Sequence, residues 1–148
     1  MYSNGFQSYR KTNVITADPK RLILMCYEGV IDNLKIAKMR YVEKDYEGKG
    51  KALIKAQDII NELLCSLDFE KGGAIARNLE SLYNYMLRRI IHTDSSRALD
   101  AIDEIIGMLD ELKSAWEEAF YKQDREIQPE ASRFYEGRRE QVMDFAGV

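Results

Sequence analysis

The feature of this sequence that most restricts its fold is the placement of its two prolines. Pro19 and Pro129 are the only prolines in 148 residues, so the long stretch between them lacks the residue that most strongly breaks an α-helix. Apolar residues recur across it at the three- and four-residue spacing of amphipathic helices. No β-branched segment alternates with period two, as a half-buried strand would. The sequence therefore predicts an all-α fold.

The apolar pattern divides this stretch into four helices. The first begins at Pro19, because Asp18 can cap the free amide groups and proline suits the first helical position. Asp68 and the Gly72–Gly73 pair are expected to end the second helix. The predicted helices are 19–41, 50–67, 75–90 and 98–119. Short connections favour antiparallel neighbours, so we expect an antiparallel up-and-down four-helix bundle over residues 19–122.

The two ends of the chain differ from this middle part. Residues 1–18 contain scattered apolar side chains without helical periodicity, and we interpret them as an N-terminal cap segment. Residues 123–148 lack a wide apolar stripe and fit either a C-terminal tail or a short docked helix. The large apolar side chains of this last segment are Phe134, Tyr135, Val142 and Phe145.

Composition excludes several classes of function. The net charge of −3 and the pI of about 5.3 argue against nucleic acid as the main partner. No apolar run approaches the roughly 18 residues of a membrane span, so direct membrane insertion is not expected. No apolar secretory segment is visible at the start, which favours the cytosol. Cys26 and Cys65 lie within apolar helical patterns, which indicates buried free thiols rather than a disulfide.

The residues that would carry catalysis are missing. His92 is the only histidine and is expected at the end of the third helix. The di-iron site that some bundles hold needs a glutamate three residues before a histidine, and Arg89 occupies that position. Phosphate-binding glycine motifs, paired cysteines and nucleophile elbows are also absent from the sequence. We therefore expect no metal, no cofactor and no enzymatic activity.

Charge is distributed unevenly along the chain. Residues 94–120 contain eight acids against two bases, whereas residues 19–44 contain six bases against three acids. One interpretation is electrostatic pairing of the first and fourth helices, together with a solvated face. The other is an acidic surface that steers a basic partner. Gly107, in the middle of the fourth helix, fits either an exposed position or a close approach of another helix.

The helices also carry more apolar residues than a narrow bundle seam needs. The excess fits a broad core covered by the terminal segments. The alternative is a groove that accepts an amphipathic helix from a partner.

The start of the chain resembles the opening of the FliS family of flagellin export chaperones. It reads YRKTNVITADP over 9–19, then LILMCYEG over 22–29. The family opens with Tyr, four residues, Val, one residue and Thr, then a proline and a Leu-Ile-Leu-Met-Leu-Tyr-Asp/Glu-Gly block. Cys26 replaces the usual leucine, which is a small apolar exchange. Segments 55–63, 67–86 and 109–116 extend the resemblance, in order, over about residues 9–120.

The resemblance implies a helical bundle that binds the disordered C-terminal region of flagellin in the cytosol. Such a chaperone prevents premature polymerisation and delivers its cargo to the flagellar type III export gate. The implied mechanism is coupled folding and binding, in which an amphipathic segment becomes ordered against apolar faces of the bundle.

The resemblance and the apolar faces together suggest partner-binding residues. The candidates are Tyr9, Val14, Ala56, Ile59, Leu63, Tyr83 and Leu87. Residues 1–18 would cover part of the groove in the free protein and move aside for flagellin, whereas a static cap on the bundle end is the alternative. A self-associating helical-bundle adaptor without catalytic activity is the alternative function.

Overall fold

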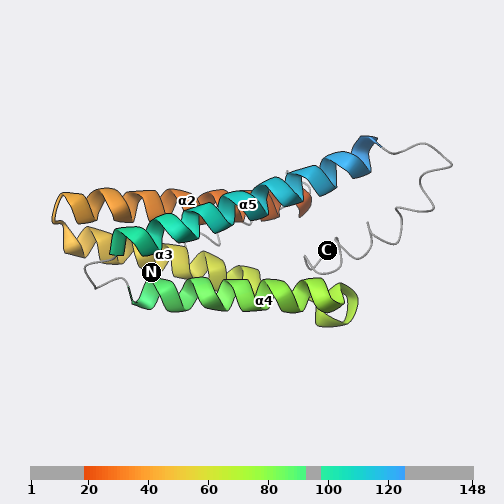
Figure 1. Cartoon of the computed structure of the whole chain (residues 1–148), viewed down its shortest axis with the longest axis horizontal. Helices are drawn as coiled ribbons and strands as arrows, with labels where there is room; N and C mark the ends of the chain where they lie inside the picture. The colour runs from red at the N-terminus through yellow and green to blue at the C-terminus, as the bar shows by residue number, and fades with distance from the viewer. Residues whose placement is uncertain (1–18, 93–97, 126–148) are drawn as a thin grey trace.

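The computed structural model describes residues 19–92 and 98–125 and shows four helices (Figure 1). They are α2 (Pro19–Val42), α3 (Tyr46–Cys65), α4 (Phe69–Ile91) and α5 (Ala98–Arg125). These described residues contain no strand, so the all-α prediction is confirmed.

Successive helices run in opposite directions (Figure 1). Helix α2 contacts α3 and α5, and α4 also contacts α3 and α5, so the helices follow one another around the bundle. This is the arrangement of the predicted antiparallel four-helix bundle.

The core lies on the axis between the four helices. Each helix buries one stripe of side chains, spaced by three and four residues as the sequence pattern requires. The largest fully buried side chains come from all four helices. They are Tyr27, Val30, Leu34, Ile60, Tyr83, Met86, Ile90, Ile102, Ile105 and Leu109. Burying one such apolar side chain stabilises the fold by roughly 1.5–3 kcal/mol.

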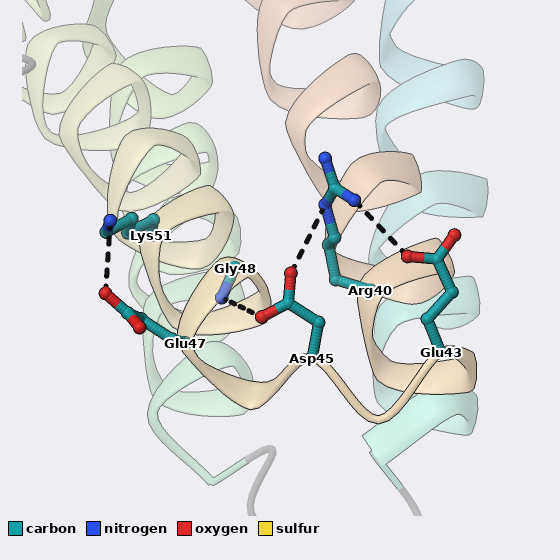
Figure 2. A network of polar contacts seen from close by, with 6 residues as sticks. All are labelled: Arg40, Glu43, Asp45, Glu47, Gly48 and Lys51. Atoms are coloured by element: carbon teal, nitrogen blue, oxygen red, sulfur yellow. Dashed lines mark hydrogen bonds and ion pairs between the residues drawn. The ribbon is translucent and has the colours of Figure 1, made fainter.

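The turn between α2 and α3 is held by Asp45, the N-cap of α3 (Figure 2). Its Oδ1 accepts a hydrogen bond of 2.9 Å from the backbone N–H of Gly48, and its Oδ2 lies 3.7 Å from Nε of Arg40. Arg40 also pairs with Glu43 at 3.2 Å. Lys44 completes the turn with a positive φ of 63°. This cap starts α3 at Tyr46, four residues before the predicted start.

The prediction for the α3–α4 connection was wrong. Asp68 does not end the second helix but caps the next one, because its carboxylate accepts hydrogen bonds from the backbone N–H groups of Glu70 and Lys71 at 3.1 and 3.0 Å. The glycine pair consequently lies inside α4. Gly73 adopts φ 52° and ψ −127°, which kinks the helix after its first turn. An L-residue with a side chain rarely adopts this conformation.

Two further sequence predictions can be compared with the structure. Cys26 is a buried free thiol as expected, but Cys65 is exposed. Leu63 points into the core, and Cys65, two residues further along the helix, therefore points to the opposite side. Helix α5 continues to Arg125, past the predicted end at 119. The cap segment 1–18 lies outside the described residues, and so do residues 126–148 of the predicted tail.

Candidate partner-binding site

Three aromatic side chains form a hydrogen-bonded group in the core. The indole Nε1–H of Trp116 on α5 donates to Oη of Tyr27 on α2 over 2.7 Å. Oη of Tyr27 lies 2.6 Å from Oη of Tyr83 on α4, and their ring centroids are 6.4 Å apart. The group therefore joins α2 to α4 across the bundle and ties both to α5.

Burial raises the pKa of both phenols. Desolvation raises the pKa of Tyr27 to about 12, although the hydrogen bonds from Tyr83 and Trp116 oppose the shift. Desolvation also raises the pKa of Tyr83, and the proximity of Tyr27 adds to the rise. Both phenols therefore stay neutral near pH 7, and their hydrogen bonds connect three helices.

The predicted site residues on α3 and α4 lie together in the core. Ala56, Ile59 and Leu63 on α3 and Tyr83 on α4 are buried members of one hydrophobic cluster. Leu87 on α4 is half-buried and packs against the same cluster. Their role in partner binding stays a prediction. Tyr9 and Val14 lie outside the described residues.

The position of Ile59 explains one glycine of the opening motif. Cδ1 of Ile59 would lie 3.1 Å from a Cβ added at Gly29, so the lack of a side chain there lets α2 and α3 come close. Sequence reasoning did not find this contact. The helical pattern shows which face is apolar but not which residue of another helix fills the space.

Sequence reasoning also missed the apolar side chains on the surface. Val42, Tyr46 and Ile91 lie at the end of the bundle where α2 and α4 end, and Val42 is 66% exposed (Figure 1). Phe69 and Tyr121 lie toward the other end, where α4 begins and α5 ends. The remaining exposed large apolar side chains are Ile36, Met39, Ile54 and Ile75. All of these side chains lie outside the core, where a partner can contact them.

One carboxylate on α3 is unusual. Oδ2 of Asp58 is shielded from solvent and has no hydrogen-bond partner. The pKa of Asp58 is raised, first by desolvation and second by the nearby carboxylate of Glu62. The exposed side chain of Ile54 lies one turn earlier on the same side of α3. The exposed side chain of Ile54 is available to a partner, whereas the Oδ2 atom of Asp58 is not.

Ion pairs join the first and fourth helices, as one of the two interpretations of the charge distribution expects, although in one of them the base is on the fourth helix. Lys38 on α2 contacts Asp103 on α5 at 2.8 Å, and Lys113 on α5 contacts Glu28 on α2 at 3.2 Å. Glu104 on α5 also joins α4, because it accepts a hydrogen bond from the phenol of Tyr85. Such partly exposed pairs contribute about 0–1 kcal/mol each, so they select the neighbour more than they stabilise the fold.

The described residues contain no group of three histidine, cysteine or acidic side chains that could hold a metal ion. His92 is exposed at the C-cap of α4, as expected for a histidine at a helix end. None of the described helices is long and apolar enough to cross a membrane.

The fold and this site define a small antiparallel helical bundle that presents apolar side chains outside its core. Comparison with known families gives one match over most of the chain, in which the model described as "Flagellar protein FliS" covers residues 2–123. The chain therefore belongs to the FliS family, and the resemblance of its opening motif is confirmed.

Individual relatives give the same assignment. The chain is 38% identical to the flagellar secretion chaperone FliS of Salmonella typhimurium, over 93% of this chain and 100% of the relative. It is 34% identical to the flagellar secretion chaperone FliS of Vibrio cholerae, over 77% and 87%. It is 32% identical to the protein of that name from Escherichia coli, over 80% and 92%.

Proposed function

We propose that this protein is a flagellar secretion chaperone of the cytosol that binds the disordered C-terminal region of flagellin. It prevents premature polymerisation and delivers the subunit to the flagellar type III export apparatus. The observation that carries this proposal is the family match over residues 2–123, together with relatives that are named flagellar secretion chaperones.

The surface of the bundle suits coupled folding and binding. An amphipathic segment that becomes helical satisfies its own backbone hydrogen bonds, so it needs mainly apolar contacts from its partner. Exposed apolar side chains such as Ile54 and Ile75 supply them. The ordering cost of about 2–5 kcal/mol keeps such a complex releasable for export.

The buried candidates need a rearrangement before they can contact flagellin. Ile59, Leu63 and Tyr83 have almost no exposed surface, whereas Leu87 is partly accessible. In our proposal residues 1–18, through Tyr9 and Val14, cover part of the binding surface in the free protein and move aside for flagellin.

We infer that the protein acts by binding and has no catalytic step. The two buried phenols stay neutral near pH 7, and the single histidine is exposed at a helix end. Replacement of His92 by alanine is therefore expected to leave flagellin binding unchanged.

The direct test is calorimetric titration of the full chain with a flagellin C-terminal peptide, with circular dichroism alongside. We expect saturable 1:1 binding, a negative heat-capacity change and a gain of helix. Binding heat without a gain of helix would support flagellin as the partner but would reject coupled folding. If no binding is observed, and sedimentation depends on concentration without flagellin, the self-associating adaptor becomes the better function.

A matched pair of variants tests the proposed surface. Leu87 and Ile106 are both half-buried and both pack against the core, on α4 and α5 respectively. Leu87→Ala is expected to weaken flagellin binding about tenfold, as truncation of a central apolar contact typically does. Ile106→Ala, which removes similar packing elsewhere, is expected to change the affinity by less than about twofold. Equal losses of affinity in the two variants would show that the effect comes from reduced stability of the bundle and not from a lost contact between Leu87 and flagellin.

A further inference from the structure

The two halves of α4 are packed into the bundle to different extents. The second half, residues 83–91, buries three large side chains, and the first half, residues 69–81, buries only one, that of Leu79. The other two buried residues of the first half are Gly72 and Ala76, which have little or no side chain. Because hydrophobic stabilisation grows with the apolar area removed from water, packing holds the second half more firmly than the first.

The polar contacts described above between α4 and other helices show the same asymmetry. Tyr83 hydrogen-bonds to Tyr27 of α2. Tyr85 and Arg89 both bind Glu104 of α5. Figure 1 shows α5 rising away from α4 toward its C-terminal end, which is the end of the bundle where α4 begins. The first half of α4 therefore receives less support from α5 than the second half does.

The backbone of the first half is also interrupted. Gly73 has φ 52° and ψ −127°, so the chain leaves the helical conformation after the first turn of α4. Phe69 and Ile75, on either side of this kink, are 41% and 37% exposed and remain partly in solvent. A helical segment with few buried apolar contacts opens locally more readily than its neighbours. The first half of α4 has this character.

The part of α3 beside the first half of α4 contains predicted partner-binding residues. Helices α3 and α4 are antiparallel and are joined by residues 66–68, so positions at equal distances from this connection lie at the same height. Ala56 and Leu63 of α3 are therefore level with the first half of α4, and both are buried in the core cluster. Withdrawal of this half would uncover that part of α3, whereas Ile59 would stay against Gly29 of α2.

We propose that the first half of α4 opens locally as a flap while the second half stays docked, and that a flagellin segment binds the part of α3 uncovered in this way. The opening supplies the rearrangement that Ala56 and Leu63 need before they can contact a partner. The identity of the partner rests on the proposed function. The opening is a property of the free chain, so it is tested without flagellin.

Hydrogen exchange of the full-length chain, read by mass spectrometry, tests the opening. Amides of 78–81 lie in continuous helix beyond the kink, so their exchange reports on the flap and not on the first turn. We expect their protection from exchange to be at least about tenfold lower than that of amides 86–91 in the same helix. Low concentrations of urea should speed exchange at 86–91 more, because complete unfolding exposes more surface than the flap does. Equal protection of the two segments would overturn the proposal.

Two substitutions of the same kind distinguish opening of one half from opening of the whole helix. Arg77 and Arg88 are both exposed on α4, one in each half. Glycine has a lower helix propensity than arginine, by an amount that corresponds to about fourfold in an opening equilibrium. Arg77→Gly should therefore speed exchange at 78–81 by about that factor. Arg88→Gly should speed exchange at 86–91 and leave 78–81 unchanged. If Arg88→Gly speeds both segments equally, α4 opens as one unit and the proposal is wrong.

Calorimetric titration of the same variants with a flagellin C-terminal peptide tests the link to binding. If the peptide binds only the open form, the apparent affinity is proportional to the open fraction. Arg77→Gly should then tighten binding about fourfold, although it destabilises the helix. Arg77→Ala removes the same charge but keeps the helix propensity, and it should change the affinity by less than about twofold.

The outcomes separate the flap from the proposed function. Unchanged affinity in Arg77→Gly would show that the opening is not a step in binding, and equal tightening in Arg77→Ala would assign the effect to the lost charge. Either result would overturn the role of the flap. A wild-type chain that shows the opening but binds no flagellin peptide would instead reject the proposed function, while the exchange data would still establish the opening.

Discussion

The indole of Trp116 donates a hydrogen bond of 2.7 Å to the phenol oxygen of Tyr27, a residue 89 positions earlier in the chain. The same oxygen is 2.6 Å from the phenol oxygen of Tyr83, so Tyr27 is the central member of the group. Buried polar atoms are costly when they lack partners, and here each phenol has one. Polar contacts between three helices are thus placed inside an otherwise apolar core.

The central position of Tyr27 predicts unequal effects of two similar substitutions. Tyr27→Phe removes both hydrogen bonds of the group, whereas Tyr83→Phe removes only one. Since each bond contributes about 0.5–1.5 kcal/mol, Tyr27→Phe should lower the free energy of unfolding by about 1 kcal/mol more than Tyr83→Phe. Urea denaturation measures both. Equal midpoints with unchanged slopes would show that Tyr27 does not hold the group together.

The raised pKa values predict a loss of stability at high pH. Tyrosine ionises near pH 10 in the unfolded chain, but burial raises the pKa of Tyr27 to about 12 and also raises that of Tyr83. A folded-state pKa above the unfolded value means that the stabilisation is complete below pH 10 and is lost as the pH rises. Above pH 10 stability should therefore fall, by at most about 1.4 kcal/mol per pH unit for each phenol that is still protonated in the folded state.

Urea unfolding at a series of pH values measures this slope. Tyr83→Phe should reduce it, because one of the two phenols no longer titrates on unfolding. A slope that is the same in wild type and Tyr83→Phe would mean that other groups cause the alkaline loss.

Two glycines are predicted to respond in opposite ways to the same substitution. Gly73 has φ 52°, so Gly73→Ala should cost about 1–3 kcal/mol of backbone strain. Gly107 is exposed within regular helix, and an added Cβ there meets nothing within 4 Å, so Gly107→Ala should stabilise by up to about 1 kcal/mol. Thermal unfolding should show a lower Tm for the first variant and a higher one for the second. Two shifts of the same sign would contradict the conformation described at Gly73.

The contact between Gly29 and Ile59 is predicted to make their substitutions non-additive. Gly29→Ala brings a new Cβ to 3.1 Å from Cδ1 of Ile59, and Ile59→Val removes that same methyl group. The double variant should therefore be at least about 0.5 kcal/mol more stable than the sum of the two single effects predicts. A double-mutant cycle in urea gives this coupling energy. A coupling energy near zero would show that Gly29 and Ile59 are not in close contact.

Much of the fold could be predicted because buried side chains recur every three or four residues along a helix. Residues assigned to the first and fourth helices by spacing alone, such as Tyr27, Leu34 and Ile105, lie in the core. The helix ends could not be predicted as well. In the sequence, Asp68 could either end the second helix or cap the third. Only the hydrogen bonds that it accepts from the backbone N–H groups of Glu70 and Lys71 show that it is a cap.

The candidate site was harder to predict for a different reason. Ile59 and Ile54 look alike in the sequence, yet one is buried beside Gly29 and the other is exposed. Which apolar residues a partner can reach depends on how the helices cover one another, and this requires contacts between distant parts of the chain. Family resemblance suggested the partner, but it did not show which side chains are accessible.

The aromatic group also fixes the axial register of the bundle. An apolar core alone tolerates a helix that slips along its neighbours, since one turn of about 5.4 Å brings similar side chains back into place. After such a slip of α5, Trp116 would no longer reach Tyr27, and the buried polar atoms would lose their partners. Only one alignment of α2, α4 and α5 satisfies all three residues, so the group selects a single packing among several that apolar contacts would accept.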